Sequence, residues 1–182
     1  MAGYVALLRG INVGGKNPIK MTDLRACFEE QGFRDVSTYI QSGNVVFGSN
    51  VTRVVDLVHK IERMLAAAFD YEASVAVRSR TQMRAVVERA PAGFGADPST
   101  YRSDVIFLKP PLTARAAMKG IYIREGVDQA FAGTGVLYFS RLTSRASQSQ
   151  LSRIVGTPIY QSMTIRNWNT TTRLQQMVDA LG

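Results

Sequence analysis

A glycine-rich loop between a predicted buried strand and a predicted helix holds the first residues whose spacing suggests chemistry. Gly10-Ile-Asn-Val-Gly-Gly-Lys-Asn17 has the spacing G-x-x-x-x-G-K of a phosphate-binding loop. In such a loop, backbone N–H groups converge on an anion and Lys16 adds positive charge. Asn17 lacks the hydroxyl that would bind Mg²⁺, and Pro18 delays the helix. These features argue against an NTPase and leave two interpretations: an anion cradle that includes Asn12 and Lys16, and a loop whose glycines only turn the chain.

A second polar segment, residues 38–44, lies between two predicted strands and reads Thr-Tyr-Ile-Gln-Ser-Gly-Asn. Gln41 and Asn44 offer hydrogen-bond donors and acceptors at the tip of the hairpin. In the structural interpretation this is a tight turn in which Gly43 and Asn44 take positive φ. In the functional interpretation it is a polar wall beside the glycine-rich loop, because a split β-α-β fold brings the two segments to the same edge of the sheet.

A third segment, residues 164–171, precedes the last predicted helix and holds the single tryptophan of the chain. In one interpretation Trp168 fills a gap in the core and Asn169 or Thr170 caps the helix. In the other, the run Arg166-Asn167-Trp168 forms a site for an anion or a stacked base at a helix N-terminus.

The single cysteine, Cys27, cannot form an internal disulfide, so we expect a cytoplasmic location. Cys27 falls on the apolar stripe of a predicted helix, which favours a place in the core, and His59 falls on a solvated helix face. One cysteine and one histidine do not make the common structural zinc sites, so we expect no metal and no cofactor. No apolar run approaches the length of about 20 residues that a bilayer span needs, and we expect no membrane association.

The chain of 182 residues has 22 basic and 14 acidic side chains, a net charge of +8. Residues 1–80 carry 10 basic and 8 acidic side chains, net +2, whereas residues 81–182 carry 12 and 6, net +6. Only five of the basic residues are lysines, and arginine suits bidentate contacts with phosphate or carboxylate. Arg141, Arg145 and Arg153 lie among serines, which fits either a polyanion-facing surface or a charged loop. Asp104 has no evident carboxylate partner, so no paired acid/base mechanism is indicated.

The apolar pattern predicts an α+β fold. The first half has the order strand, helix, strand, strand, helix, strand, which is typical of a ferredoxin-like split β-α-β unit. Its strands are predicted at 3–9, 36–40, 45–47 and 73–77, and its helices are predicted to begin at Thr22 and at Asn50 or Thr52.

The second half repeats this order more loosely, which raises the hypothesis of a degenerate duplication. Helices are predicted at 81–89 with Thr81 as cap, at 112–118, at 147–155 and at the end of the chain, and strands at 104–108, 121–123, 129–131 and 136–139. We therefore expect two subdomains, 1–80 and 81–182, packed on one another.

Two runs of the sequence resemble a known family. Residues 4–47 read YVALLRGINVGGKNPIKMTDLRACFEEQGFRDVSTYIQSGNVVF, and residues 166–170 read RNWNT. The first is similar to the opening, and the second to the C-terminal signature, of an uncharacterised bacterial family, domain of unknown function 1697. The resemblance implies a small cytosolic α+β protein of ferredoxin-like character and brings no established activity.

Three hypotheses of function follow from these segments. The first is a binding module for a phosphate-bearing or otherwise anionic ligand, either nucleic acid or a small molecule. It requires the three segments to line one positively charged recess, with these ligand-binding residues: Arg9, Asn12, Lys16, Gln41, Asn44, Arg166, Asn167 and Trp168. The second is a small metal-independent enzyme that uses the same cluster, with Lys16 or Tyr39 as the acid or base. In the third, the segments only support the fold.

Overall fold

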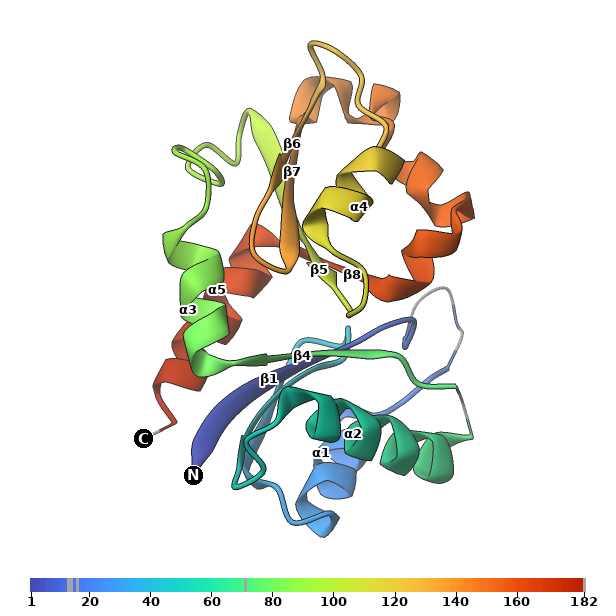
Figure 1. Ribbon diagram of the computed structural model, residues 1–182, viewed down its shortest axis with the longest axis vertical. Helices are drawn as coiled ribbons and strands as arrows, with labels where there is room; N and C mark the ends of the chain where they lie inside the picture. The colour runs from blue at the N-terminus through green and yellow to red at the C-terminus, as the bar shows by residue number, and fades with distance from the viewer. Residues whose placement is uncertain (13–14, 16, 71, 182) are drawn as a thin grey trace. The chain divides into compact units, whose positions relative to one another are not determined.

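The structure is a computed structural model that describes residues 1–12, 15, 17–70 and 72–181. The chain divides into two compact units, which are described separately below (Figure 1). Unit 1 comprises Met1–Arg84 together with Arg173–Gly182, and unit 2 comprises Ala85–Thr172. The predicted α+β class is confirmed, while the packing of a subdomain 81–182 on a subdomain 1–80 stays a prediction.

Unit 1 contains a four-stranded antiparallel sheet in the order β2-β3-β1-β4, which is the order of a ferredoxin-like split β-α-β unit. Helices α1 and α2 lie on the same face of this sheet (Figure 1). The elements are β1 (Ala2–Leu8), α1 (Met21–Glu30), β2 (Arg34–Tyr39), β3 (Asn44–Ser49), α2 (Val54–Phe69) and β4 (Val75–Ser79).

The core of unit 1 is built from side chains that recur every second residue on the strands and every third or fourth residue on the helices. The Phe28, Phe33 and Phe47 rings meet there, with centroids 4.7 to 5.4 Å apart. Burial of each such large side chain stabilises the fold by about 1.5–3 kcal/mol before entropy is counted. The apolar stripe of α2 consists of Leu57, Val58, Ile61, Met64 and Leu65.

The predicted caps of the first two helices are wrong. The N-cap of α1 is Lys20 rather than Thr22, and that of α2 is Arg53 rather than Asn50 or Thr52. Neither cap residue makes a side-chain hydrogen bond to its helix. Packing of the apolar stripe against the sheet therefore decides where these helices begin, because tertiary burial outweighs the roughly 1 kcal/mol of a cap.

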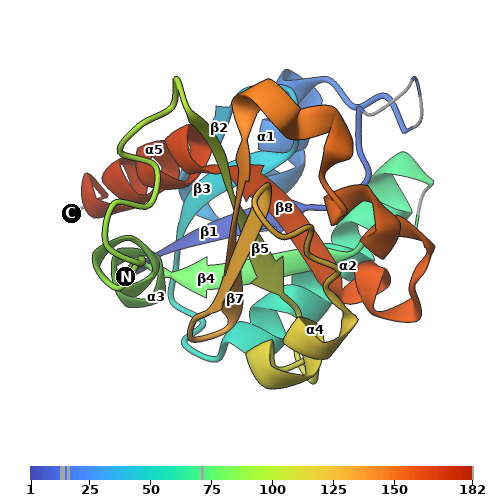
Figure 2. The ribbon, with the colours of Figure 1, turned by 90° about the horizontal axis from the view of Figure 1, so that it is seen from above.

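Unit 2 contains a second four-stranded antiparallel sheet, in the order β6-β7-β5-β8. Helix α4 packs on it, and three short 3₁₀ helices lead from β7 to β8 (Figure 2). The elements wholly within unit 2 are β5 (Tyr101–Leu108), α4 (Ala114–Gly120), β6 (Asp128–Ala132), β7 (Val136–Leu142), η1 (Thr143–Gln148), η2 (Leu151–Gly156), η3 (Pro158–Ser162) and β8 (Met163–Asn167). Helices α3 (Arg80–Glu88) and α5 (Trp168–Asp179) each contribute residues to both units.

Two sequence predictions for unit 2 are wrong. Residues 121–123 are irregular rather than a strand, and residues 147–155 form 3₁₀ turns rather than an α-helix. The second segment has serine at 147, 149 and 152, and these side chains compete for backbone hydrogen bonds and so disfavour a continuous α-helix.

The two units repeat the same strand order with the same local hydrogen bonds. In unit 1 the Leu8 N–H donates to Gly43 O at 2.8 Å, and in unit 2 the Leu108 N–H donates to Gly135 O at 3.0 Å. The next residue in each unit donates to a serine carbonyl: Arg9 to Ser74 O at 3.0 Å, and Lys109 to Ser162 O at 2.8 Å. A degenerate duplication predicts such matched details, with the 3₁₀ helices of unit 2 in the place of α2.

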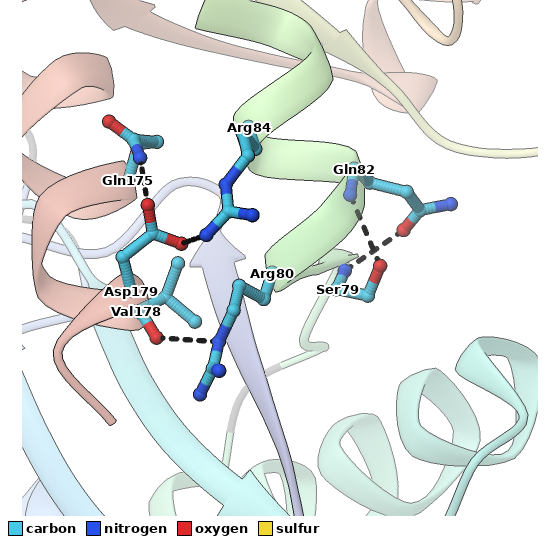
Figure 3. Close-up of polar contacts among 7 residues, drawn as sticks. All are labelled: Ser79, Arg80, Gln82, Arg84, Gln175, Val178 and Asp179. Atoms are coloured by element: carbon cyan, nitrogen blue, oxygen red, sulfur yellow. Dashed lines mark hydrogen bonds and ion pairs between the residues drawn. The ribbon is translucent and has the colours of Figure 1, made fainter. Parts of the chain in front are cut away.

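The C-terminal turn of α5 is fixed to the first turns of α3 within unit 1 (Figure 3). Arg80 Nε donates to Val178 O at 3.1 Å, and Arg84 Nη2 lies 2.9 Å from Asp179 Oδ1. Gln175 also donates to the Asp179 carboxylate. The last helix of the chain is therefore held by side chains that extend from α3.

The start of α3 is capped reciprocally by two side chains (Figure 3). The Gln82 N–H donates to Ser79 Oγ at 3.2 Å, and the Ser79 N–H donates to Gln82 Oε1 at 2.9 Å. This is a capping box, and it assigns the cap to Ser79 rather than to the predicted Thr81. Across the described residues, no helix is long and apolar enough to span a membrane.

Candidate functional site

The glycine-rich loop and the hairpin turn meet in unit 1, and Asn12 joins them. Its Nδ2 donates to Gln41 O and to Ile19 O, both at 2.9 Å, while its Oδ1 accepts from the Ile19 N–H at 2.8 Å. Asn12 holds this position with a left-handed φ of 52°. Its amide is thus engaged in supporting the loop, as the structural interpretation predicts.

The turn residues also serve the fold. Asn44 is fully buried, and its Nδ2 donates to Tyr39 O at 2.9 Å and to Ser42 Oγ at 3.0 Å. Positive φ occurs at Ile40 and Gly43, rather than at Gly43 and Asn44 as predicted. Two features require glycine at position 43. Its φ of 75° is unfavourable for other residues, and an added Cβ would lie 2.6 Å from Ile11 Cδ1.

The other predicted residues of unit 1 are placed at the same edge of its sheet. Arg9 is half-buried directly after β1, and Gln41 is exposed at the turn. Lys16 lies outside the described residues. The structure therefore brings Arg9, Asn12, Gln41 and Asn44 into one neighbourhood, in which Asn12 and Asn44 have structural roles.

The third predicted segment belongs to unit 2, and its residues point to different faces of the sheet. Arg166 pairs with Val105 and Asn167 pairs with Asp104, so their side chains alternate across the sheet. Arg166 Nη1 donates to Ile165 O at 2.9 Å, and burial lowers the pKa of its guanidinium to about 10. A recess that joins this segment to the two in unit 1 stays a prediction.

Asn167 caps the last helix. Its Oδ1 accepts from the Thr170 N–H at 2.8 Å, so the cap is Asn167 and not the predicted Asn169 or Thr170. The helix consequently begins at Trp168, two or three residues earlier than the predicted caps imply. The Phe94 ring lies edge-on to the Trp168 indole with centroids 5.2 Å apart, and an added Cβ on Gly95 would come within 2.1 Å of the indole.

Asn167 and Trp168 line a pocket of about 330 Å³ within unit 2. The pocket lies beside the first residues of β5, beyond the point at which β8 ends and α5 begins. Its charged lining consists of Arg102, Asp104 and Arg141. We call this space the β5 pocket.

The three charged side chains of the β5 pocket share one face of the sheet. Arg102 and Arg141 are direct partners across the β5–β7 pair, and Asp104 is the diagonal neighbour of Arg141. Directly opposed like charges are unfavourable, and Asp104 lowers that cost because its Oδ2 lies 3.3 Å from Arg141 Nη2. Two cations and one anion leave the lining with one excess positive charge.

Asp104 is held where a negative charge is poorly solvated. Its Oδ2 is buried and accepts no hydrogen bond from any residue that the structure describes. Desolvation raises the pKa of this carboxyl above its ordinary value, although Arg141 and, to a smaller degree, Arg102 act in the opposite direction. Asp104 is therefore easier to protonate than an exposed aspartate.

The internal repeat shows that the fold does not dictate these charges. The strand partners Arg102 and Arg141 of unit 2 correspond to the partners Ala2 and Ser49 of unit 1, by the shared register of the sheets. Asp104 corresponds to Tyr4, which is 3% exposed and stacks on Phe47. The core position of Tyr4 in unit 1 is thus taken by the half-buried Asp104 in unit 2, beside the half-buried Arg141 and the exposed Arg102. Charges that are partly removed from solvent are costly enough to suggest a function.

The sequence reasoning missed Arg102 as a site residue and treated Asp104 and Arg141 separately. The signal was the two-residue period of Tyr101-Arg-Ser-Asp104, which puts Arg102 and Asp104 on one face of a strand. It was hidden because the predicted strand began at Asp104. Among the residues described, no three His, Cys, Asp or Glu side chains gather to hold a metal ion.

These features define a two-unit α+β protein with a duplicated strand order and a charged pocket in its second unit. The chain belongs to the family described as Protein of unknown function (DUF1697), which matches residues 1–138. The resemblance seen at residues 4–47 is thereby confirmed, whereas the run at 166–170 lies beyond the matched residues.

A solved structure described as a conserved bacterial protein, from Streptococcus pneumoniae, is similar throughout. The TM-score is 0.84 at 28% sequence identity, over 97% of this chain and 98% of that chain. A comparison with curated proteins gives no match. The similarity supports the two-unit fold and carries no activity.

Proposed function

We propose that the protein binds a small anionic ligand, such as an aryl or nucleoside phosphate, in the β5 pocket. The observation that carries this proposal is the pair Arg102 and Arg141, directly opposed on one face and lining a pocket beside Trp168. Guanidinium groups make bidentate hydrogen bonds to phosphate or carboxylate oxygens. Trp168 supplies an aromatic surface, and Asn167 supplies a side-chain amide, for the rest of the ligand.

Trp168 provides the test, because it is the single tryptophan of the chain and it lines the pocket. Titration with phenyl phosphate is expected to change its fluorescence with a saturable curve. Arg141→Gln and Arg102→Gln should each weaken binding about ten- to a hundredfold, the size expected for one lost charge-assisted hydrogen bond. Arg115→Gln, at an exposed arginine on α4, is the matched control and should leave binding unchanged.

The opposite result would be a fluorescence signal that does not saturate, or equal behaviour of the three arginine variants. Either one would remove the proposal. Residues 81–182 carry six excess positive charges, so nucleic acid is the alternative anionic ligand to compare with phenyl phosphate. Binding of a single-stranded oligonucleotide would lose log affinity linearly with log salt, with a slope of about −0.7 per phosphate neutralised.

A second candidate is a metal-independent enzyme in which Asp104 transfers a proton. The observation that favours it is a partly buried carboxyl with a raised pKa beside an arginine in a pocket. This assignment replaces Lys16 and Tyr39 as the acid or base. Turnover of aryl phosphates by the wild-type protein that is lost in Asp104→Asn would support this candidate. Binding of aryl phosphates without turnover would exclude the enzyme and leave only the binding function.

We also propose a cytoplasmic location in a bacterial cell. Two observations support this: the one cysteine, Cys27, is a buried free thiol, and the similar solved structure is that of a bacterial protein. Fractionation of the source cells would test the location.

A further inference from the structure

We propose that an anion entering the β5 pocket between Arg102 and Arg141 is bound together with a proton, which Asp104 takes up. This inference rests on the proposed function, because it describes how the charge of the same pocket changes when the ligand arrives. The balance is simple: the anion replaces the Asp104 carboxylate as the partner of Arg141, and the carboxylate takes one proton from solvent.

The geometry of the ion pair is the first argument. Arg141 Nη2 lies 3.3 Å from Asp104 Oδ2, yet this oxygen accepts no hydrogen bond from the described residues. The pair is held by charge alone, without the aligned N–H···O contacts of a bidentate pair. A phosphate in the pocket can offer two oxygens to one guanidinium, so it is the better partner for Arg141.

The surroundings of Asp104 are the second argument. On its own strand the facing charge is Arg102, and on β7 it is Arg141. On β8 its strand partner is the neutral Asn167. On β6 Asp128 is opposite Arg141; its Oδ2 accepts the N–H groups of Arg124 and Gln150, and its buried Oδ1 accepts no hydrogen bond from the described residues. Asp128 does not line the pocket.

The charge of the lining is the third argument. With Asp104 ionised the lining carries one excess positive charge, and with Asp104 protonated it carries two, which matches a phosphate dianion. The bound anion also neutralises Arg141, which otherwise favours the ionised form of Asp104. Desolvation then dominates and favours the protonated form of Asp104. Protonation of Asp104 and binding of a dianion therefore favour one another, by thermodynamic linkage.

The experiment compares the wild-type protein with Asp104→Asn, whose amide has the shape of the neutral carboxyl. The Kd of phenyl phosphate is measured by Trp168 fluorescence from pH 5 to pH 8.5 in both proteins. The ionisation of the probe is common to the two, so it cancels in their ratio. We expect wild-type affinity to fall with rising pH more steeply than that of the variant, by up to tenfold per pH unit.

Calorimetry on the wild-type protein keeps the inference testable if the variant fails to fold. Titrations in two buffers with different ionisation enthalpies should give uptake of up to one proton per ligand beyond that of the probe. Parallel pH profiles, or no excess proton uptake, would overturn the inference while leaving anion binding in place. Absence of any binding of phenyl phosphate to the wild-type protein would instead overturn the proposed function and the inference with it.

Discussion

Asn12 is bonded to the main chain of Gln41, with Nδ2 2.9 Å from the Gln41 carbonyl oxygen. The same side chain also makes hydrogen bonds to both the carbonyl oxygen and the N–H of Ile19. One residue thus links the segment that follows β1, the end of the segment before α1 and the tip of the β2–β3 hairpin. The polar side chain of Asn12 is accounted for by this local role.

Replacement of Asn12 by alanine should therefore destabilise the protein. Three hydrogen bonds are lost at about 1 kcal/mol each, and alanine is less tolerant of the left-handed φ, so we expect a loss of about 3 kcal/mol in the free energy of unfolding. Asn17→Ala is the matched control, because Asn17 also has positive φ but donates one exposed hydrogen bond, to Gly10 O. Urea denaturation measures both, and equal losses would contradict the role assigned to Asn12.

The close packing behind the hairpin turn gives a second prediction. In Gly43→Ala the new Cβ would lie 2.6 Å from Ile11 Cδ1 and 2.8 Å from Leu8 Cβ, at a φ of 75°. We expect a loss of about 3 kcal/mol, the sum of left-handed strain and overpacking.

Gly32→Ala separates these two contributions. Gly32 has a φ of 83°, but a Cβ there meets none of the described atoms within 4 Å. Gly32→Ala should therefore lose only about 1 kcal/mol in the free energy of unfolding, from backbone strain alone. Thermal and urea unfolding of both variants would show the difference, and a Gly43 variant as stable as the Gly32 variant would mean that Ile11 moves aside freely.

The strand order of unit 1 could be predicted from the sequence because its apolar periods are clear. Both faces of β1 and β3 are buried, and the side chains that enter the core with α1 and α2 recur every second residue on these strands and every third or fourth residue on α2. The helix starts could not be predicted, since no side-chain cap fixes Lys20 or Arg53. A capping hydrogen bond contributes about 1 kcal/mol, which is less than the packing of a whole helix face contributes.

The site in unit 2 shows where sequence reasoning ends. Trp168 and Asn167 were found because a lone tryptophan beside polar residues is conspicuous. Their pairing with Arg102 and Arg141 depends on the register of β5 with its neighbours. Register is set by contacts between segments far apart in the chain, and a shift of one residue reverses every side chain. The cluster is therefore a property of the sheet rather than of any one segment.

The helix cap at Asn167 gives a third prediction. Asn167→Ala removes the acceptor for the Thr170 N–H and should cost about 1 kcal/mol, whereas Asn167→Asp keeps an acceptor and should be close to wild type in stability. The aspartate also adds a negative charge to the lining of the β5 pocket, so it should weaken phenyl phosphate binding while it preserves the fold. Unfolding curves and Trp168 fluorescence separate the two effects. A well-folded Asp variant with unchanged affinity would remove Asn167 from the binding site.

The fourth prediction concerns the pH dependence of stability. Because the pKa of Asp104 is raised in the folded protein, the folded state binds its proton more tightly than the unfolded chain does. The contribution of Asp104 to stability is therefore fully present below the ordinary aspartate pKa of about 3.9, and it is lost as pH rises through the raised value. Relative to Asp104→Asn, the wild-type protein should lose stability over this window, by at most about 1.4 kcal/mol per pH unit.

Asp97 supplies a control of opposite sign in the same unit. Hydrogen bonds from the side chains of Ser99 and Thr100 hold the pKa of its carboxyl at about 2, so its contribution is present above the ordinary aspartate pKa and is lost only as pH falls toward 2. Between pH 4 and pH 8 the difference in unfolding free energy between wild type and Asp97→Asn should thus stay constant. The difference for Asp104→Asn should change over the same range, as followed by urea denaturation at each pH. If both differences are flat, the Asp104 carboxyl is not desolvated as the structure places it, and its role in the β5 pocket fails with it.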